Sequence, residues 1–336
     1  MKRINLNEFS ERAMALADVP AVTDLFNAAS LVDIGLMDSE PEELAVHFQT
    51  PGFDLATDTL LIENRDGKLA AMAEVWDVRE PRVRAWCWGT VHPDFRGQGL
   101  GRRLVNWIEE RGRWGLQRVP EGLRVSFTTN MPETNQAANQ LFIASGWKWA
   151  RQTRVMRIVM DEAPALPALP AGIEIRAVKP GDEKPVLQAM QESFLDHWGS
   201  VNEPFDVYYE RMMGYVTHTK DFDHSLWFAA YEGGDVCGTA MNIASVPEDA
   251  DMGWVNTLGV RRPWRKQGVG LALLQQTFGE FFRRGKHKVG LGVDALSLTG
   301  ATRLYERAGM KILRAYNVYE KEIRAGIELV TQSIAA

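Results

Sequence analysis

The stretch Val91-His92-Pro93-Asp94-Phe95-Arg96-Gly97-Gln98-Gly99-Leu100-Gly101-Arg102-Arg103-Leu104 is informative because the chain contains it twice. The second copy is Val260-Arg261-Arg262-Pro263-Trp264-Arg265-Lys266-Gln267-Gly268-Val269-Gly270-Leu271-Ala272-Leu273, at a constant offset of 169 residues. Six of the 14 positions are identical, including the Arg, the Gln and two glycines. A repeat of this kind indicates two related domains in one chain.

A second pair of matching segments supports the duplication. Leu141-Phe142-Ile143-Ala144-Ser145-Gly146-Trp147 corresponds to Leu304-Tyr305-Glu306-Arg307-Ala308-Gly309-Met310. Between the two halves, residues 161–172 contain three prolines and no helix or strand pattern, which is typical of a semi-rigid linker. We therefore expect an N-terminal domain at 1–160, a linker at 161–172 and a C-terminal domain at 173–336.

Length and composition agree with two globular domains. The chain has 336 residues, of which 45% are hydrophobic and 24% charged. It contains no run of about 18 apolar residues and no secretory signal, so we expect no membrane partner. The net charge of −6 argues against a nucleic-acid partner. Only two cysteines, Cys87 and Cys237, are present, which fits a cytoplasmic protein.

Each copy has the pattern of an α/β (α+β) domain. Apolar runs flank the turns Asp66-Gly67 and Gly233-Gly234-Asp235, which predicts a β-hairpin in each half. A third strand, at 86–91 and 254–260, precedes each glycine motif. Helical spacing follows the glycines, and an alternating strand and a short helix come next.

The glycine motif has the properties of an anion site. A strand leads into it and a helix leads out, so the free N–H groups of the first helical turn point toward one place. Residues 255–290 add eight basic residues against one acidic residue, whereas residues 91–115 hold five against three. The alternative is a glycine-rich turn with a solvated basic face. A Walker loop is excluded because no Lys-Ser/Thr pair ends the motif, and a dinucleotide-binding fold would place its loop after the first strand.

These motifs resemble those of the GNAT superfamily of acyl-CoA-dependent N-acetyltransferases. The superfamily pattern Arg/Gln-x-x-Gly-x-Gly/Ala follows a strand ending in Val, and both glycine stretches match it. The tandem arrangement resembles the mycothiol synthase-like group of double-domain acetyltransferases. The resemblance implies two GNAT-like domains, each a mixed, mostly antiparallel sheet flanked by helices. It also implies acetyl-CoA as co-substrate, bound by Val91, Arg96, Gly97, Gln98, Gly99, Leu100 and Gly101 in copy one and by Leu258, Val260, Arg265, Lys266, Gln267, Gly268, Val269 and Gly270 in copy two.

The resemblance also implies a proton donor for the leaving thiolate, a role that a tyrosine hydroxyl can perform. Tyr305 has that hydroxyl, whereas Phe142 at the matching position lacks it. We therefore expect the C-terminal domain to be catalytic, with Tyr305 as general acid, and the N-terminal domain to be a degenerate copy. The alternative for Tyr305 is a core aromatic residue on a helix.

The general base is not evident from the sequence. Superfamily members often carry a Glu on the strand before the glycine motif, but residues 86–90 and 254–258 contain no carboxylate. Asp294, Asp196, His197 and Glu203 are candidates, each with a structural or solvated role as the alternative. No His/Cys cluster has the spacing of metal ligands, so we expect no metal.

Three functions remain open at this point. The first is transfer of an acyl group from CoA to a primary amine of a small molecule, with the chemistry in the C-terminal domain. The second is a non-catalytic CoA-binding regulatory or scaffold protein, which the missing Glu and Leu298 in place of the superfamily Asn favour. The third is acetylation of protein N-termini or lysines. Release of free thiol from acetyl-CoA with a panel of amines distinguishes the first two.

Overall fold

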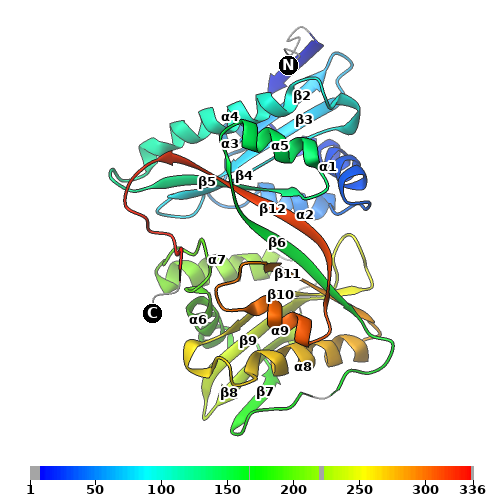
Figure 1. The fold of residues 1–336 in the computed structure, drawn as a ribbon, viewed down its shortest axis with the longest axis vertical. Helices are drawn as coiled ribbons and strands as arrows, with labels where there is room; N and C mark the ends of the chain where they lie inside the picture. The colour runs from blue at the N-terminus through cyan, green and yellow to red at the C-terminus, as the bar shows by residue number, and fades with distance from the viewer. Residues whose placement is uncertain (1–7, 166, 219–222, 334–336) are drawn as a thin grey trace. The chain divides into compact units, whose positions relative to one another are not determined.

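The computed structural model describes residues 8–165, 167–218 and 223–333 (Figure 1). The chain forms two compact units. Unit 1 consists of Met1–Gln152 and Tyr316–Leu329, and unit 2 consists of Thr153–Ala315 and Val330–Ala336. None of the helices in the described part of the chain is long and apolar enough to cross a membrane.

Unit 1 contains a mixed sheet with the strand order β1-β2-β3-β4-β5-β12. Only β4 and β5 pair in parallel, and the other neighbouring strands are antiparallel. The predicted hairpin around Asp66-Gly67 is present as β2 and β3. The strands are β1 (Phe9–Arg12), β2 (Thr59–Asn64), β3 (Leu69–Trp76), β4 (Arg84–Val91), β5 (Val125–Pro132) and β12 (Lys311–Arg324).

Five α-helices are described in unit 1, and two of them position the glycine loop. They are α1 (Val19–Asp33), α2 (Pro41–Phe48), α3 (Leu55–Asp58), α4 (Leu100–Gly115) and α5 (Gln136–Ala144). On one face of the sheet, α1 packs Phe26 with the buried Met72 of β3. On the other, α4 lies so close to the sheet that a Cβ added at Gly112 would be 1.6 Å from the Phe127 ring. A side chain at position 112 is therefore excluded by the contact between α4 and β5.

Unit 2 repeats this arrangement. Its strand order is β7-β8-β9-β10-β11-β6, and only β10 and β11 pair in parallel. The second predicted hairpin is present as β8 and β9. The strands are β6 (Lys148–Val159), β7 (Ile173–Ala177), β8 (Trp227–Glu232), β9 (Asp235–Ile243), β10 (Met252–Val260) and β11 (Lys288–Asp294). The helices are α6 (Glu183–Phe194), α7 (Phe205–His218), α8 (Val269–Arg283) and α9 (Ala301–Arg307).

The last strand of each sequence half pairs in the sheet built mainly from the other half. β6 follows α5 in the chain, but its Thr153–Val159 part pairs with β11, with Thr153 opposite Asp294. β12 follows α9, but from Tyr316 onward it pairs with β5, with Tyr316 opposite Pro132. The compact units therefore differ from the contiguous segments 1–160 and 173–336. Residues 161–165 and 167–172 between them form no helix or strand.

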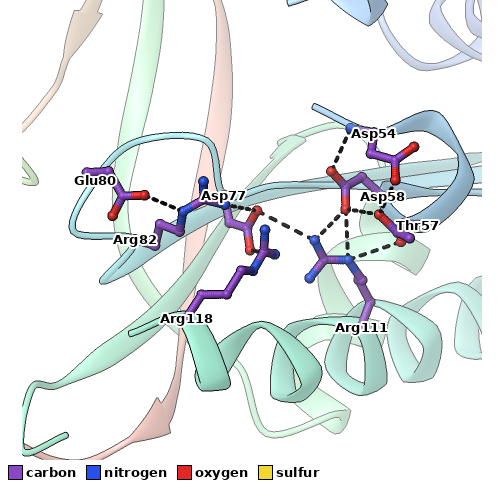
Figure 2. A network of polar contacts seen from close by, with 8 residues as sticks. All are labelled: Asp54, Thr57, Asp58, Asp77, Glu80, Arg82, Arg111 and Arg118. Atoms are coloured by element: carbon purple, nitrogen blue, oxygen red, sulfur yellow. Dashed lines mark hydrogen bonds and ion pairs between the residues drawn. The ribbon is translucent and has the colours of Figure 1, made fainter. Parts of the chain in front are cut away.

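A buried polar network fixes the C-terminal end of α4 (Figure 2). Arg111 of α4 donates from Nε to the Asp58 carboxylate (2.9 Å) and to the backbone carbonyl of Thr57 (3.0 Å). Asp77, just after β3, accepts a hydrogen bond from Arg118 at 2.7 Å. Asp58 is 1% exposed and Arg111 is 7% exposed. The network ties α4, α3 and the end of β3 together, and so orients the helix that begins at the glycine loop.

Candidate functional site

The glycine loop of copy one runs from the end of β4 at Val91 to the start of α4 at Leu100. Gly97 and Gly99 have φ values of +78° and +92°, in the left-handed region that favours glycine. Gly99 is the N-cap of α4, and no side chain caps the helix. The N–H groups of its first turn are therefore available to an anion.

Copy two has a loop of similar backbone conformation. Gly268 is the N-cap of α8 with φ +94°, again without a side-chain cap. Lys266, at the place of Gly97, also has a left-handed φ of +62°. A non-glycine residue held in this conformation is strained, and such strain concentrates at functional sites. The Lys266 side chain is exposed and forms no ion pair with any other described residue.

The last glycine of each motif, Gly101 or Gly270, serves packing. A Cβ added at Gly101 would lie 3.0 Å from a methyl group of Leu141, and one at Gly270 would lie 3.2 Å from a methyl group of Leu304. These contacts place α5 against the first turn of α4, and α9 against the first turn of α8. As a result, the residue after each leucine, Phe142 or Tyr305, lies on a helix next to the glycine loop.

The two motif arginines are held by carboxylates. Arg96 donates to the Val91 carbonyl at 3.3 Å and binds both oxygens of Asp33, at 2.7 and 2.9 Å. Arg265 donates to the Val260 carbonyl at 2.9 Å and pairs with Asp196. These side chains hold each loop against the end of its strand and against the C-terminal end of a helix, α1 in unit 1 and α6 in unit 2. Their contact with a ligand stays a prediction.

Asp196 is an anchor of the copy-two loop. It accepts hydrogen bonds from Arg262 and Arg265, which hold its pKa down to about 2 against the pull of partial burial. A carboxylate that stays ionised and bound in this way is a poor proton acceptor. The structure therefore favours the structural role for Asp196.

Most of the positive charge predicted around the copy-two loop is neutralised within unit 2. Lys286 donates to the Ala250 carbonyl, and Lys266 is left exposed. The excess of basic residues in 255–290 therefore does not form a free positive patch. The neutralising pairs, besides those of Asp196, are Arg261 with Glu192, Arg283 with Glu280, Arg284 with Glu280 and Asp223, and Lys288 with Asp249.

A cavity of about 860 Å³ surrounds the copy-one loop in unit 1. β4, the loop, α1, α4 and α5 supply its walls, including Trp88, Leu104 and Phe142. Six of the seven copy-one residues predicted to bind the cofactor line it, and Gln98 does not: the six are Val91, Arg96, Gly97, Gly99, Leu100 and Gly101. The N-terminal unit thus has space for a ligand next to its loop, although it was expected to be the degenerate copy.

Tyr305 lies on α9 and is 7% exposed, within an apolar cluster that includes Leu274 and Phe278. Burial raises the pKa of its hydroxyl to about 12. No hydrogen bond of this hydroxyl to another described residue is present. Phe142, its counterpart, stacks on Tyr319 with ring centroids 5.7 Å apart. Both positions are therefore buried aromatic positions, and the hydroxyl distinguishes the two copies.

The other residues predicted as candidates for the general base form contacts within the protein. Glu203 pairs with Arg211, and Asp294 accepts a hydrogen bond from the Leu296 backbone N–H at 3.0 Å. The His197 ring packs on Phe194, with centroids 4.4 Å apart. Across the described ranges, no group of three or more His, Cys, Asp or Glu side chains is arranged to hold a metal ion.

The structure shows one carboxylate–imidazole pair near the copy-one loop that the sequence analysis missed. Glu74 of β3 is buried and lies 3.1 Å from Nε2 of His47 on α2. The signal was a single charged residue within an otherwise apolar strand, Leu69-Ala70-Ala71-Met72-Ala73-Glu74-Val75-Trp76. Glu74 lies on β3, the neighbour of β4, whereas superfamily members often carry the Glu on the strand before the glycine motif.

Comparison with known proteins gives matches over both halves. The model of the acetyltransferase (GNAT) family matches residues 28–146 and 187–310. A mycothiol acetyltransferase of Thermobispora bispora is 30% identical over 223 residues, 65% of this chain and 70% of the relative. One of Streptomyces scabiei is 30% identical over 236 residues, 69% of this chain and 70% of the relative. The crystal structure of a GCN5-related N-acetyltransferase from Sphaerobacter thermophilus has 37% identity and a TM-score of 0.80, and covers 96% of this chain and 98% of that one.

Proposed function

Since this chain belongs to the GNAT family of acetyltransferases, we propose that it transfers an acetyl group from acetyl-CoA to a primary amine of a small molecule. The observation that carries the proposal is the pair of helix N-termini without a side-chain cap, each preceded by a left-handed glycine in the loop that follows a strand. The relatives named mycothiol acetyltransferases support a small-molecule acceptor.

The loops suit the pyrophosphate of CoA. The N–H groups at the start of α4 and α8 supply donors together with the positive end of the helix dipole. In unit 2, the exposed Lys266 adds a cation beside these donors. The backbone of β10 near Leu258 and Val260 is proposed to hold the pantetheine arm and to polarise the thioester carbonyl, which stabilises the negative charge of the tetrahedral intermediate.

We assign the chemistry to unit 2 because of Tyr305. The neutral amine attacks the thioester carbonyl, the new C–N bond forms, and the C–S bond breaks. The departing thiolate takes the Tyr305 proton, and the amine proton restores the hydroxyl through solvent. A pKa of about 12 keeps Tyr305 protonated at neutral pH, so it is able to donate. The contact between Leu304 and Gly270 supports a position of this helix beside the loop.

The test is Tyr305→Phe in the full chain, assayed as CoA thiol release from acetyl-CoA with a panel of primary amines. We expect kcat to fall about 100-fold, with KM for acetyl-CoA unchanged. Tyr231→Phe is the matched control, because Tyr231 is a buried tyrosine of β8 in the same unit. Unchanged turnover in Tyr305→Phe removes the acid assignment. CoA binding without turnover for any amine overturns the proposed function in favour of a binding protein.

A further inference from the structure

The buried carboxylate of unit 1 is held by an ordered imidazole. The ring of His47 stacks on Trp76 with centroids 4.4 Å apart and an interplanar angle of 18°. Phe48 contacts the same ring edge-on at 5.1 Å, and the Phe53 ring lies 6.0 Å from His47 and 4.7 Å from Trp76. These contacts fix the orientation of the ring while its Nε2 faces Glu74. The Glu74 side chain is 8% exposed and the His47 side chain 37% exposed, so the imidazole is the part of the pair that faces solvent.

This pair adjoins the wall of the cavity around the copy-one loop. Glu74 of β3 is directly opposite Trp88 of β4 in the antiparallel register. Cross-strand partners project from the same face of the sheet, about 5 Å apart. Trp88 lines the cavity, as do Thr90 and Val91 further along β4. On β4 the cavity lining ends at Trp88, so a molecule that extends along this strand beyond Trp88 approaches the Glu74–His47 pair.

The second copy lacks this pair. Val91 is opposite Ala71 in unit 1, and Val260 is opposite Gly238 in unit 2. The same register puts Met241 opposite Thr257 where unit 1 has Glu74 opposite Trp88. Met241 is 2% exposed and belongs to an apolar cluster. The two units thus carry different parts of the machinery, since Tyr305 is in unit 2 and the carboxylate–imidazole pair is in unit 1.

We propose that Glu74 and His47 form the proton-accepting pair of a second acceptor-amine site, which lies in unit 1 beside the cavity of the glycine loop. The inference rests on the proposed acetyl transfer from CoA. An ammonium group is attracted by the Glu74 carboxylate and by the ring of Trp88, which lines the cavity. The expected acceptor is therefore a small cationic primary amine that carries a flat apolar group.

The proton balance of this site is complete without a tyrosine. The ammonium gives one proton to His47, whose imidazolium is stabilised by Glu74 as in other carboxylate–imidazole pairs. The neutral amine attacks the thioester carbon, the C–N bond forms and the C–S bond breaks. The second amine proton goes to the departing thiolate, and His47 returns its proton to solvent. Phe142 at the position of Tyr305 is compatible with this route.

The test uses the full chain and two variants, His47→Gln and Glu74→Gln. Turnover is measured as thiol release from acetyl-CoA with tryptamine, phenethylamine and 1,6-diaminohexane between pH 6 and pH 9. The pH profile of the site depends on the charged groups around His47. Glu74 contacts the His47 imidazole, and Glu43 lies one helical turn before His47 on α2. Tryptamine binding is measured by calorimetry in the presence of CoA. We expect His47→Gln to lower kcat with the arylalkyl amines about 100-fold, to flatten the rise of kcat/KM with pH, and to leave KM for acetyl-CoA unchanged.

The matched control is His224→Gln, which removes the imidazole from a second His–Glu pair. His224 Nε2 lies 2.9 Å from Glu183, at the end of α6 opposite to the one that holds the glycine loop of unit 2. We expect this variant to keep both turnover and the pH profile. A folding defect is excluded where the thermal unfolding of His47→Gln matches that of the control.

Each outcome decides between the two sites. If Tyr305→Phe abolishes turnover and His47→Gln changes it by less than twofold, the second site is overturned and the proposed function stands. If turnover survives Tyr305→Phe and is lost in His47→Gln, the second site is supported. Absence of turnover with every amine contradicts the proposed function, and the binding measurement then decides alone. Tryptamine binding that Glu74→Gln weakens at least tenfold supports the amine site, and binding that is absent or unchanged overturns it.

Discussion

Lys321 and Glu109 form an ion pair across 212 residues of sequence, with the Lys321 Nζ 2.5 Å from the Glu109 Oε1. Lys321 is on β12, which comes from the end of the chain, and Glu109 is on α4, which follows the first glycine loop. Arg124 makes similar pairs with Glu320 and Glu322 of β12. The far end of the sequence is therefore an integral part of the unit that contains the N-terminal glycine loop.

The exchange of strands predicts that neither half of the sequence folds alone. A fragment of residues 1–160 lacks β12, so β5 becomes an edge strand and Glu109 loses its ion pair with Lys321. We expect this fragment to be insoluble or to show no cooperative thermal transition. Co-expression with residues 161–336 supplies the missing strand and restores a folded complex.

The control for this experiment is the full chain with a protease site inserted in the linker at 161–172. Cleavage there removes no strand from either sheet. We expect the nicked protein to elute as one species and to keep its unfolding temperature within a few degrees. A stable, monomeric 1–160 fragment with a cooperative transition contradicts the exchanged arrangement.

Much of each unit could be predicted from the sequence, and the limits have physical causes. The hairpins, the strand before each glycine loop and the helix after it follow from turn residues and apolar spacing. No strand was predicted after Trp147 or Met310, where β6 and β12 lie. Side-chain alternation tells which face of a strand is buried, whereas the choice of the neighbouring strand depends on backbone groups that all sequences share. The sequence therefore did not predict that β6 pairs with β11 and β12 with β5.

The ion pairs that hold the glycine loops could not be predicted from the sequence for a related reason. Asp33 precedes Arg96 by 63 residues, and Asp196 precedes Arg265 by 69 residues. Each ion pair depends on the way a helix packs across the sheet, which composition and periodicity do not specify. The loop glycines were predicted from the sequence, but the basic residues around the copy-two loop were interpreted as part of a ligand-binding site. Most of that charge is used within the protein.

The strained Lys266 gives a prediction that separates stability from binding. Lys266→Gly removes the left-handed strain, which costs about 1 kcal/mol, and we expect the free energy of unfolding to rise by somewhat less than this. The same change removes the exposed cation beside the N-terminus of α8. We expect the affinity for CoA in unit 2 to fall several-fold, and more at low salt than at high salt.

Lys266→Ala is the matched control, because it removes the charge and keeps the strained conformation. It is expected to weaken CoA binding as much as Lys266→Gly does, without the gain in stability. Urea unfolding and calorimetric titration with CoA at two salt concentrations measure both effects. Equal stability of the two variants shows that the conformation of residue 266 carries no strain.

Asp196 predicts an acid-sensitive contribution to stability. Its pKa is about 2 in the folded protein, below the ordinary value of 3.8, because Arg262 and Arg265 donate to it. A lowered folded pKa contributes stability above pH 4, and this contribution is lost as the pH falls from about 4 to about 2. We expect Asp196→Asn to lower the free energy of unfolding by about 2 kcal/mol at pH 7.

The pH dependence distinguishes this ion pair from a general packing effect. The difference between wild type and Asp196→Asn is expected to shrink as the pH approaches 2, as measured by urea unfolding at a series of pH values. A difference that stays constant from pH 7 to pH 2.5 contradicts the assignment. Asp33→Asn removes the equivalent anchor of Arg96 and tests whether the loop of unit 1 depends on the same kind of pair.

The buried pair of Arg111 and Asp58 gives the last prediction (Figure 2). Removing one partner leaves the other charge buried without compensation, so we expect Arg111→Met to lower the free energy of unfolding by about 3–5 kcal/mol. The double variant with Asp58→Asn is expected to lose less than the sum of the single changes, because no uncompensated charge remains. Arg113→Ala is the control on the same helix, since its side chain is 58% exposed and its expected effect is within about 0.5 kcal/mol. Denaturant unfolding of the wild type and of the four variants measures these effects. A loss for Arg111→Met no greater than that for Arg113→Ala shows that the network does not hold α4, and that the helix behind the glycine loop is oriented by its apolar contacts alone.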